Sequence, residues 1–172
     1  MSITSINALS RRSALRLPLA MFGAAVVGHP LLALARSDPN QITVWKTPDC
    51  GCCKEWVAHL RKNGFKVMTN DVKDTAPIRQ KLGLPAKFGS CHTASLGNYV
   101  IEGHVPAQEL RRLLRDKPIA RGLAVPGMPI GSPGMDGPEY NNRKDPYDVL
   151  LVLKDDSSRV YQSYPSQSPA KS

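Results

Sequence analysis

Three of the four cysteines in the chain, Cys50, Cys52 and Cys53, lie within one four-residue stretch. The stretch follows residues 42–47, which are typical of a β-strand, and precedes a helical pattern that extends to residue 62. Thiols at a helix N-terminus are favoured as thiolates, because the free N–H groups and the helix dipole stabilise negative charge. Thiolate is both a nucleophile and a soft metal ligand, so the pattern predicts redox or soft-metal chemistry.

The spacing of these thiols leaves several interpretations open. Cys50 and Cys53 alone form the C-x-x-C spacing of thiol–disulfide exchange, but the thiol of Cys52 is unexplained there. Two structural disulfides, Cys50–Cys53 and Cys52–Cys91, are a second interpretation. Converging thiolates would instead bind Cu(I), zinc or an iron–sulfur cluster. Neighbouring cysteines fit several thiolate-bridged Cu(I) ions better than one tetrahedral zinc ion, which usually takes paired C-x₂₋₄-C ligands.

Four further side chains are candidate secondary metal ligands. Met128 and Met135 each directly follow a glycine in a Pro/Gly-rich loop, where a thioether would favour copper. The alternative for both methionines is packing as flexible core residues. His92 is adjacent to the fourth cysteine, and His104 follows a glycine at the end of a predicted strand. Imidazole also suits copper, so both histidines are included.

The first 35 residues have the composition of an export signal. Arg11 and Arg12 precede an apolar stretch at residues 17–35 that ends in a small-residue pattern, with cleavage expected after Ala35. Paired arginines are typical of the bacterial twin-arginine signal. An uncleaved membrane anchor is the alternative, and the prolines in the apolar stretch argue against it. We therefore expect an exported, periplasmic bacterial protein without a stable membrane span once the signal is removed.

Export affects the interpretation of the cysteines, because unprotected thiols in an oxidising compartment tend to form disulfides.

The rest of the composition is that of an ordinary soluble domain. The formal net charge of +9 comes from 23 basic and 14 acidic residues scattered along 172 positions. The one local basic group, Arg111, Arg112 and Arg115, is expected to be the solvated face of a helix, so no nucleic-acid partner is predicted.

The order of predicted elements is strand, helix, strand, helix, strand, strand, helix. It indicates an α/β, thioredoxin-like domain at residues 42–164: a small mixed sheet flanked by helices, preceded by a flexible linker at 36–41. In this architecture the turn before the first helix lies beside the start of the third strand, so Cys91 is expected to approach the other cysteines. Predicted segments are 42–47, about 54–62, 65–72, 76–82, 90–95, 99–102 and a helix from 106.

The C-terminal part is expected to add a long loop and a hairpin to this core. Residues 118–147 are rich in proline and glycine, and a loop of that length is usually functional or disordered. Residues 149–153 and 160–164 form the predicted hairpin, followed by a disordered tail at 165–172.

Among single residues, we expect Asp49 to cap the first helix, His59 to lie on the surface, and Trp45 and Trp56 to lie in the core.

Five motifs, in the same order, resemble those of the CopG-type periplasmic metal-binding proteins, a family first described as a domain of unknown function and linked to copper resistance. The resemblance covers about residues 42–163. The motifs are Cys50-Gly51-Cys52-Cys53-Lys54-Glu55-Trp56, Ser90-Cys91-His92-Thr93, Gly103-His104-Val105-Pro106, Pro126-Gly127-Met128-Pro129 and Gly131-Ser132-Pro133-Gly134-Met135.

The resemblance implies a thioredoxin-like fold and copper binding through the C-x-C-C triple and one further cysteine. The corresponding residues here are Cys50, Cys52, Cys53 and Cys91. It also implies interconversion of Cu(I) and Cu(II), or sequestration of copper, in the periplasm.

The leading hypothesis is therefore an exported protein of copper resistance that holds copper as a multinuclear, thiolate-bridged Cu(I) cluster, with copper ions and other periplasmic copper-handling proteins as its expected partners. Copper oxidoreductase activity is one form of this hypothesis, and a non-catalytic copper store or carrier is another. The alternative from a different class is a thiol–disulfide oxidoreductase that uses Cys50 and Cys53.

Overall fold

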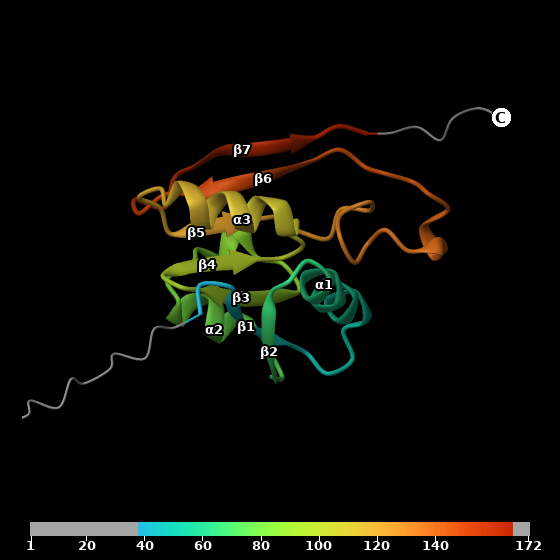
Figure 1. Cartoon of the computed structure of the whole chain (residues 1–172), viewed down its shortest axis with the longest axis horizontal. Helices are drawn as coiled ribbons and strands as arrows, with labels where there is room; N and C mark the ends of the chain where they lie inside the picture. Colours follow the sequence, from blue (N-terminus) through green and yellow to red (C-terminus); the bar gives the residue numbers. More distant parts are fainter. Residues whose placement is uncertain (1–37, 167–172) are drawn as a thin grey trace, which may run out of the picture. The chain divides into compact units, whose positions relative to one another are not determined.

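The computed structural model describes residues 38–166 (Figure 1). The predicted signal sequence, with Arg11, Arg12 and the cleavage site after Ala35, lies outside the described residues, as does most of the predicted tail. Within 38–166, no helix is long and apolar enough to cross a membrane.

One mixed sheet of seven strands organises the described residues, in the order β2-β1-β3-β4-β5-β6-β7 (Figure 1). The β1–β2 and β4–β5 pairs are parallel and the other four pairs are antiparallel. This is the thioredoxin-like arrangement that the order of elements predicts. The strands are β1 Gln41–Lys46, β2 Lys66–Asp71, β3 His92–Leu96, β4 Tyr99–Glu102, β5 Gly122–Ala124, β6 Tyr147–Val152 and β7 Ser158–Tyr164.

Three helices and two short 3-10 turns connect the strands, and their bounds are α1 Gly51–Lys62, α2 Ala76–Lys81, η1 Ala86–Phe88, α3 Ala107–Asp116 and η2 Pro138–Tyr140. Helix α1 buries Cys53, Trp56, Val57 and Leu60, whose spacing of three and four residues places them on one helical face. The helix therefore turns its first-turn cysteine and its tryptophan toward the sheet while its polar face remains in solvent.

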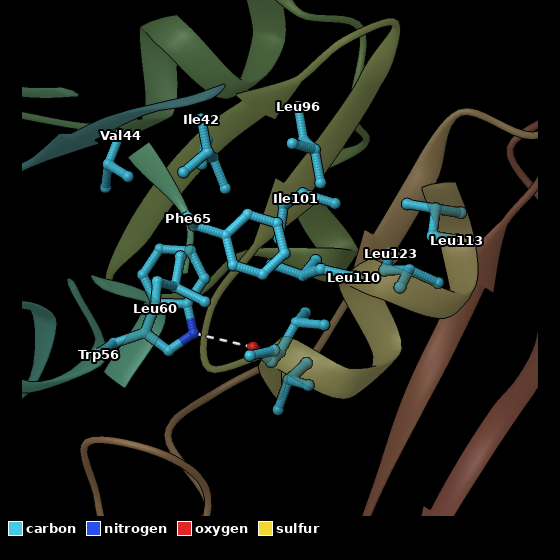
Figure 2. Close-up of a cluster of buried hydrophobic side chains, with 14 of the residues drawn as sticks. Ile42, Val44, Trp56, Leu60, Phe65, Leu96, Ile101, Leu110, Leu113 and Leu123 are labelled. Carbon is cyan, nitrogen blue, oxygen red and sulfur yellow. Dashed lines mark hydrogen bonds between the residues drawn. The ribbon is translucent and has the colours of Figure 1, made fainter. Parts of the chain in front are cut away.

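The main core lies between one face of the sheet and helices α1 and α3, as Figure 2 shows for the side chains around Trp56, Phe65, Ile101 and Leu110. The indole N–H of Trp56 donates a 2.9 Å hydrogen bond to the carbonyl of Val105, which ties α1 to the segment before α3. A smaller core covers the opposite face and consists of Leu84, Phe88, Val100, Ala124 and Val152. Alternation along β4, β5 and β6 supplies side chains to both cores.

The structure differs from the sequence expectations at the predicted loop 118–147. Residues 122–124 form strand β5, which pairs with both β4 and β6 and so joins the predicted C-terminal hairpin to the main sheet. Gly122 passes so close to β4 that an added Cβ would lie 1.7 Å from the carbonyl oxygen of Val100, so this position of β5 accepts only glycine. A three-residue strand containing glycine gives little periodicity to detect, which explains the wrong prediction.

Three single-residue expectations are also wrong. Cys50, and not Asp49, is the N-cap of α1. Trp45 is only partly buried, because it lies on β1 between the inward-facing Val44 and Lys46. His59 is half-buried: its Nε2 accepts a 3.1 Å hydrogen bond from the backbone N–H of Ala107 at the start of α3.

Candidate metal centre

The turn between β1 and α1 carries three of the four cysteines. Cys50 is the N-cap of α1, and its Sγ accepts a 3.3 Å hydrogen bond from the backbone N–H of Cys53. The same two residues are joined as a disulfide, with Cα atoms 5.3 Å apart. Cys52 is free and partly exposed, and its Sγ lies 3.5 Å from the Sγ of Cys50. A disulfide and a third sulfur thus occupy one helical turn.

Cys91 approaches this turn from the segment just before β3, as the strand order predicts. Its Sγ lies 3.9 Å from the Sγ of Cys52, although 39 residues separate the two in sequence. The Sγ atoms of all four cysteines lie within 4.8 Å of one another, close enough to contact shared metal ions. The interpretation as two structural disulfides is met only in part, because Cys52 and Cys91 remain free.

The environment of Cys91 disfavours a free thiolate. Burial raises the pKa of the Cys91 thiol to about 12, and the neighbouring Cys52 adds to the effect. Unlike the three cysteines at α1, Cys91 is not at a helix N-terminus, so no helix dipole opposes this desolvation. Near neutral pH, Cys91 therefore keeps its proton unless a cation replaces it.

Two buried histidines contact Cys91. His92 Nδ1 lies 3.3 Å and His104 Nε2 lies 3.1 Å from the Sγ of Cys91. The Nδ1–H of His104 donates a 2.8 Å hydrogen bond to the carbonyl of Pro133, which leaves the Nε2 lone pair directed at the thiol. Burial lowers the pKa of His104, so the ring is uncharged near neutral pH and its Nε2 lone pair is available to a metal ion. These three side chains form a second group that could hold a metal ion.

His92 lies deeper than His104 and is fully buried. Its ring packs against the indole of Trp56, with centroids 4.2 Å apart, and meets the ring of His104 edge-on at 5.0 Å. Burial and the proximity of His104 lower its pKa to about 3. Its Nε2 is buried and has no hydrogen-bond partner among the described residues. An uncharged imidazole whose Nδ1 faces a thiol can donate the Nδ1 lone pair to a soft or borderline metal, and the unpartnered Nε2 then carries the ring proton.

The two candidate methionines occupy different environments. Met135 is buried, and its sulfur accepts a 3.5 Å hydrogen bond from the hydroxyl of Tyr140, which fits the packing interpretation. Met128 is 51% exposed. It follows Gly127, whose N–H bonds the carbonyl of Gly89 and whose carbonyl accepts the Ser90 hydroxyl. Met128 is therefore an accessible thioether anchored beside the segment that carries Cys91.

A buried charged network behind Cys91 was not identified from the sequence. Glu102, at the end of β4, is fully buried and pairs with Arg79 of α2 at 2.8 Å. The same carboxylate accepts hydrogen bonds from the Ser90 N–H and the Thr93 hydroxyl, each at 2.7 Å. The only sequence signal that could have drawn attention to Glu102 is its place at the end of an apolar strand, next to Gly-His and four residues before the proline at the start of a helix.

Comparisons with known proteins place these features in a family. A family model described as "Protein of unknown function, DUF411" matches residues 88–135. Two solved structures of copper resistance protein CopG, form 2 and form 1, are each 41% identical to this chain. They cover 73% and 74% of this chain and 98% and 99% of their own, with TM-scores of 0.68 and 0.69. No curated protein matches. The chain therefore belongs to the CopG family of copper resistance proteins.

Proposed function

We propose that this protein binds copper in copper resistance and holds Cu(I) as a thiolate-bridged cluster between Cys50, Cys52, Cys53 and Cys91. The observation that carries the proposal is the convergence of four sulfur atoms within 4.8 Å. Thiolates are soft ligands that prefer Cu(I), and a thiolate can bridge two ions. The family relationship to copper resistance proteins gives independent support.

The donors present fit copper in number and spacing. Ligands lie about 2.0–2.3 Å from a bound metal, so neighbouring donors around one ion lie about 3–4 Å apart. The sulfur–sulfur distances of 3.5 and 3.9 Å and the sulfur–nitrogen distances of 3.1 and 3.3 Å fall in this range. His92 and His104 are thus secondary ligands in the proposal. Met128, whose thioether is exposed, would meet an entering ion, whereas Met135 is buried and bonded by Tyr140 and could bind copper only if that contact opened.

Loading requires reduction of the disulfide. An external dithiol reductant would supply the two electrons and two protons that convert Cys50–Cys53 to two thiols, and each thiol that becomes a copper ligand then loses one proton. Displacement matters most at Cys91, whose pKa of about 12 keeps the proton in place without a metal. A centre with both thiolates and imidazoles suits both copper oxidation states, so interconversion of Cu(I) and Cu(II) is part of the proposal.

The setting of this activity is proposed to be the bacterial periplasm. The support is the export signal read from residues 1–35, with Arg11 and Arg12, which lies outside the described residues. Export in a folded state would protect the thiols before they meet an oxidising compartment. Copper ions and other periplasmic copper-handling proteins are the proposed partners.

Two alternatives make distinct predictions. Thiol–disulfide exchange is favoured by one observation, the Cys50–Cys53 disulfide at the N-terminus of a helix in a thioredoxin-like fold. That activity would need Cys50 and Cys53 and be indifferent to Cys52. A copper store or carrier would use the proposed ligands and differ only by not reducing Cu(II) at a useful rate.

The test is metal analysis of the chain without residues 1–35, reduced and loaded with Cu(I) under anaerobic conditions. We expect more than one copper per protein, and less in Cys91→Ser and in Cys52→Ser. Met68→Leu, at an exposed thioether on β2, is the control and should bind as the parent does. Less than one copper per protein, with Cys91→Ser no different, would refute the proposal. Insulin reduction that is undiminished in Cys52→Ser would favour thiol–disulfide exchange.

A further inference from the structure

We propose that the buried Arg79–Glu102 ion pair is the positioning element of the metal centre, because it fixes the Ser90–Cys91 segment and thereby holds the Cys91 thiol against Cys52 and His104. This inference rests on the proposed function in that it concerns a proposed ligand. It assigns a role to Arg79 and Glu102, whose hydrogen bonds within residues 38–166 go to each other and to backbone or hydroxyl groups, and not to a cysteine sulfur.

The first support is the set of contacts that the pair makes with Ser90. Glu102 Oε1 accepts the Ser90 N–H at 2.7 Å, and the guanidinium of Arg79 donates to the Ser90 carbonyl at 3.0 Å. Ser90 lies outside the strands, so the ladder hydrogen bonds of the sheet do not satisfy its backbone. Both backbone polar groups of this residue are bound instead by one ion pair, which fixes the peptide that leads into Cys91.

The second support is how closely the segment lies on the guanidinium. A Cβ added at Gly89 would stand 3.1 Å from the guanidinium carbon of Arg79. On the other side, the Ser90 hydroxyl donates to the carbonyl of Gly127. The segment is thus held between the ion pair and the Gly127 loop, and Cys91 leaves it with its Sγ 3.1 Å from His104 Nε2 and 3.9 Å from Cys52 Sγ.

The third support is the energetics of the pair. Its side chains are 10% and 0% exposed, and a buried ion pair usually adds little net stability compared with apolar residues of similar volume. The ion pair does, however, fix the position of its neighbours, because the Thr93 hydroxyl on β3 also donates to Glu102 and holds the carboxylate in place. Strand β4 carries Glu102 and leads directly to His104, so one network sets the position of two proposed donors.

The decisive variant is Glu102→Gln, which keeps the size of the side chain but removes its charge and one acceptor oxygen. Thr93→Val is the matched control, because it removes a hydrogen bond to the same carboxylate but leaves both contacts with Ser90. Site-resolved alkylation of the reduced, metal-free protein, read by mass spectrometry, compares Cys91 with Cys52. We expect the Cys91/Cys52 rate ratio to rise about tenfold in Glu102→Gln and to change less than about twofold in Thr93→Val.

A general loss of structure would also expose Cys91 and raise the ratio, because Cys91 is the more protected thiol in the folded protein. Alkylation is therefore measured without denaturant, on variants whose urea unfolding curves show that they are folded. If Glu102→Gln does not fold, Arg79→Met combined with Glu102→Gln leaves no unpaired buried charge and is measured in the same way. An unchanged ratio in the folded variant, or an equal rise at both cysteines, would overturn the positioning role.

Competition with a Cu(I) chelator completes the test. We expect the affinity of Glu102→Gln for Cu(I) to be about tenfold weaker than that of the parent protein. If the parent protein binds no copper but the alkylation ratio still rises in the variant, the proposed function fails while the positioning role stands. If the parent protein binds copper and the variant shows neither effect, the positioning role fails while the proposed function stands.

Discussion

Gly134 joins the C-terminal loop to the helix that carries three of the cysteines. Its φ of +86° lies in the left-handed region, and a Cβ there would stand 2.6 Å from the carbonyl oxygen of Cys52 and 2.8 Å from the N of Trp56. Both are backbone atoms of α1 and cannot rotate away. The preceding residue, Pro133, supplies the carbonyl that fixes the tautomer of His104. Gly134→Ala therefore tests whether this contact supports the site.

The loss in free energy of unfolding that we expect for Gly134→Ala has two parts. A left-handed backbone costs an alanine about 1–2 kcal/mol, and overpacking against a backbone that cannot yield costs about a further 1–3 kcal/mol. Together they destabilise the protein by about 2–5 kcal/mol. Gly127→Ala is the matched control, because Gly127 has a φ of +72° but no atom lies within 4 Å of the added Cβ. Its cost should be the backbone part alone, about 1–2 kcal/mol.

Urea unfolding followed by tryptophan fluorescence measures both free energies of unfolding. The difference between the two variants isolates the contact with α1, since both share the backbone strain. A Cu(I) titration should also show weaker binding in Gly134→Ala than in Gly127→Ala, because the displaced loop carries the acceptor for His104. If the two variants unfold within about 0.5 kcal/mol of each other, the close contact does not matter and the reasoning is refuted.

Two further predictions concern the histidines. The pKa of His92 is about 3 when folded and about 6.5 when unfolded, so its contribution to stability is present above pH 6.5 and is lost as pH falls toward 3, by up to about 1.4 kcal/mol per pH unit. Urea midpoints across this window should fall less steeply in His92→Phe, and an identical slope would contradict the assignment. His59→Ala should cost about 1 kcal/mol by removing the acceptor for the Ala107 N–H. Lys54→Ala, at an exposed position of α1, should leave the unfolding midpoint almost unchanged, and an equal loss in both variants would contradict this role for His59.

Much of the fold could be predicted because its signals are local. The periodicity of residues 42–62 and the order of the elements that follow indicate a thioredoxin-like sheet, and that order correctly places Cys91 beside the first helix. The three-residue β5 could not be predicted, since its pairing depends on the close approach of Gly122 to β4. The cap at Cys50 in place of Asp49 likewise depends on how the chain enters α1.

The candidate site shows the same division. The identities of the candidate donors, including Cys52 and His104, are properties of the sequence, because residue type decides which atoms are soft or borderline ligands. Their states are not: the raised pKa of Cys91 and the lowered pKa of His92 come from burial. Only the tertiary structure brings the sulfur atoms of four cysteines within 4.8 Å and places Glu102 behind them. Burial of these side chains and the approach of residues that are distant in sequence arise only in the folded protein. The sequence therefore determines which atoms can bind a metal, and the tertiary structure determines that they lie together and which of them are protonated.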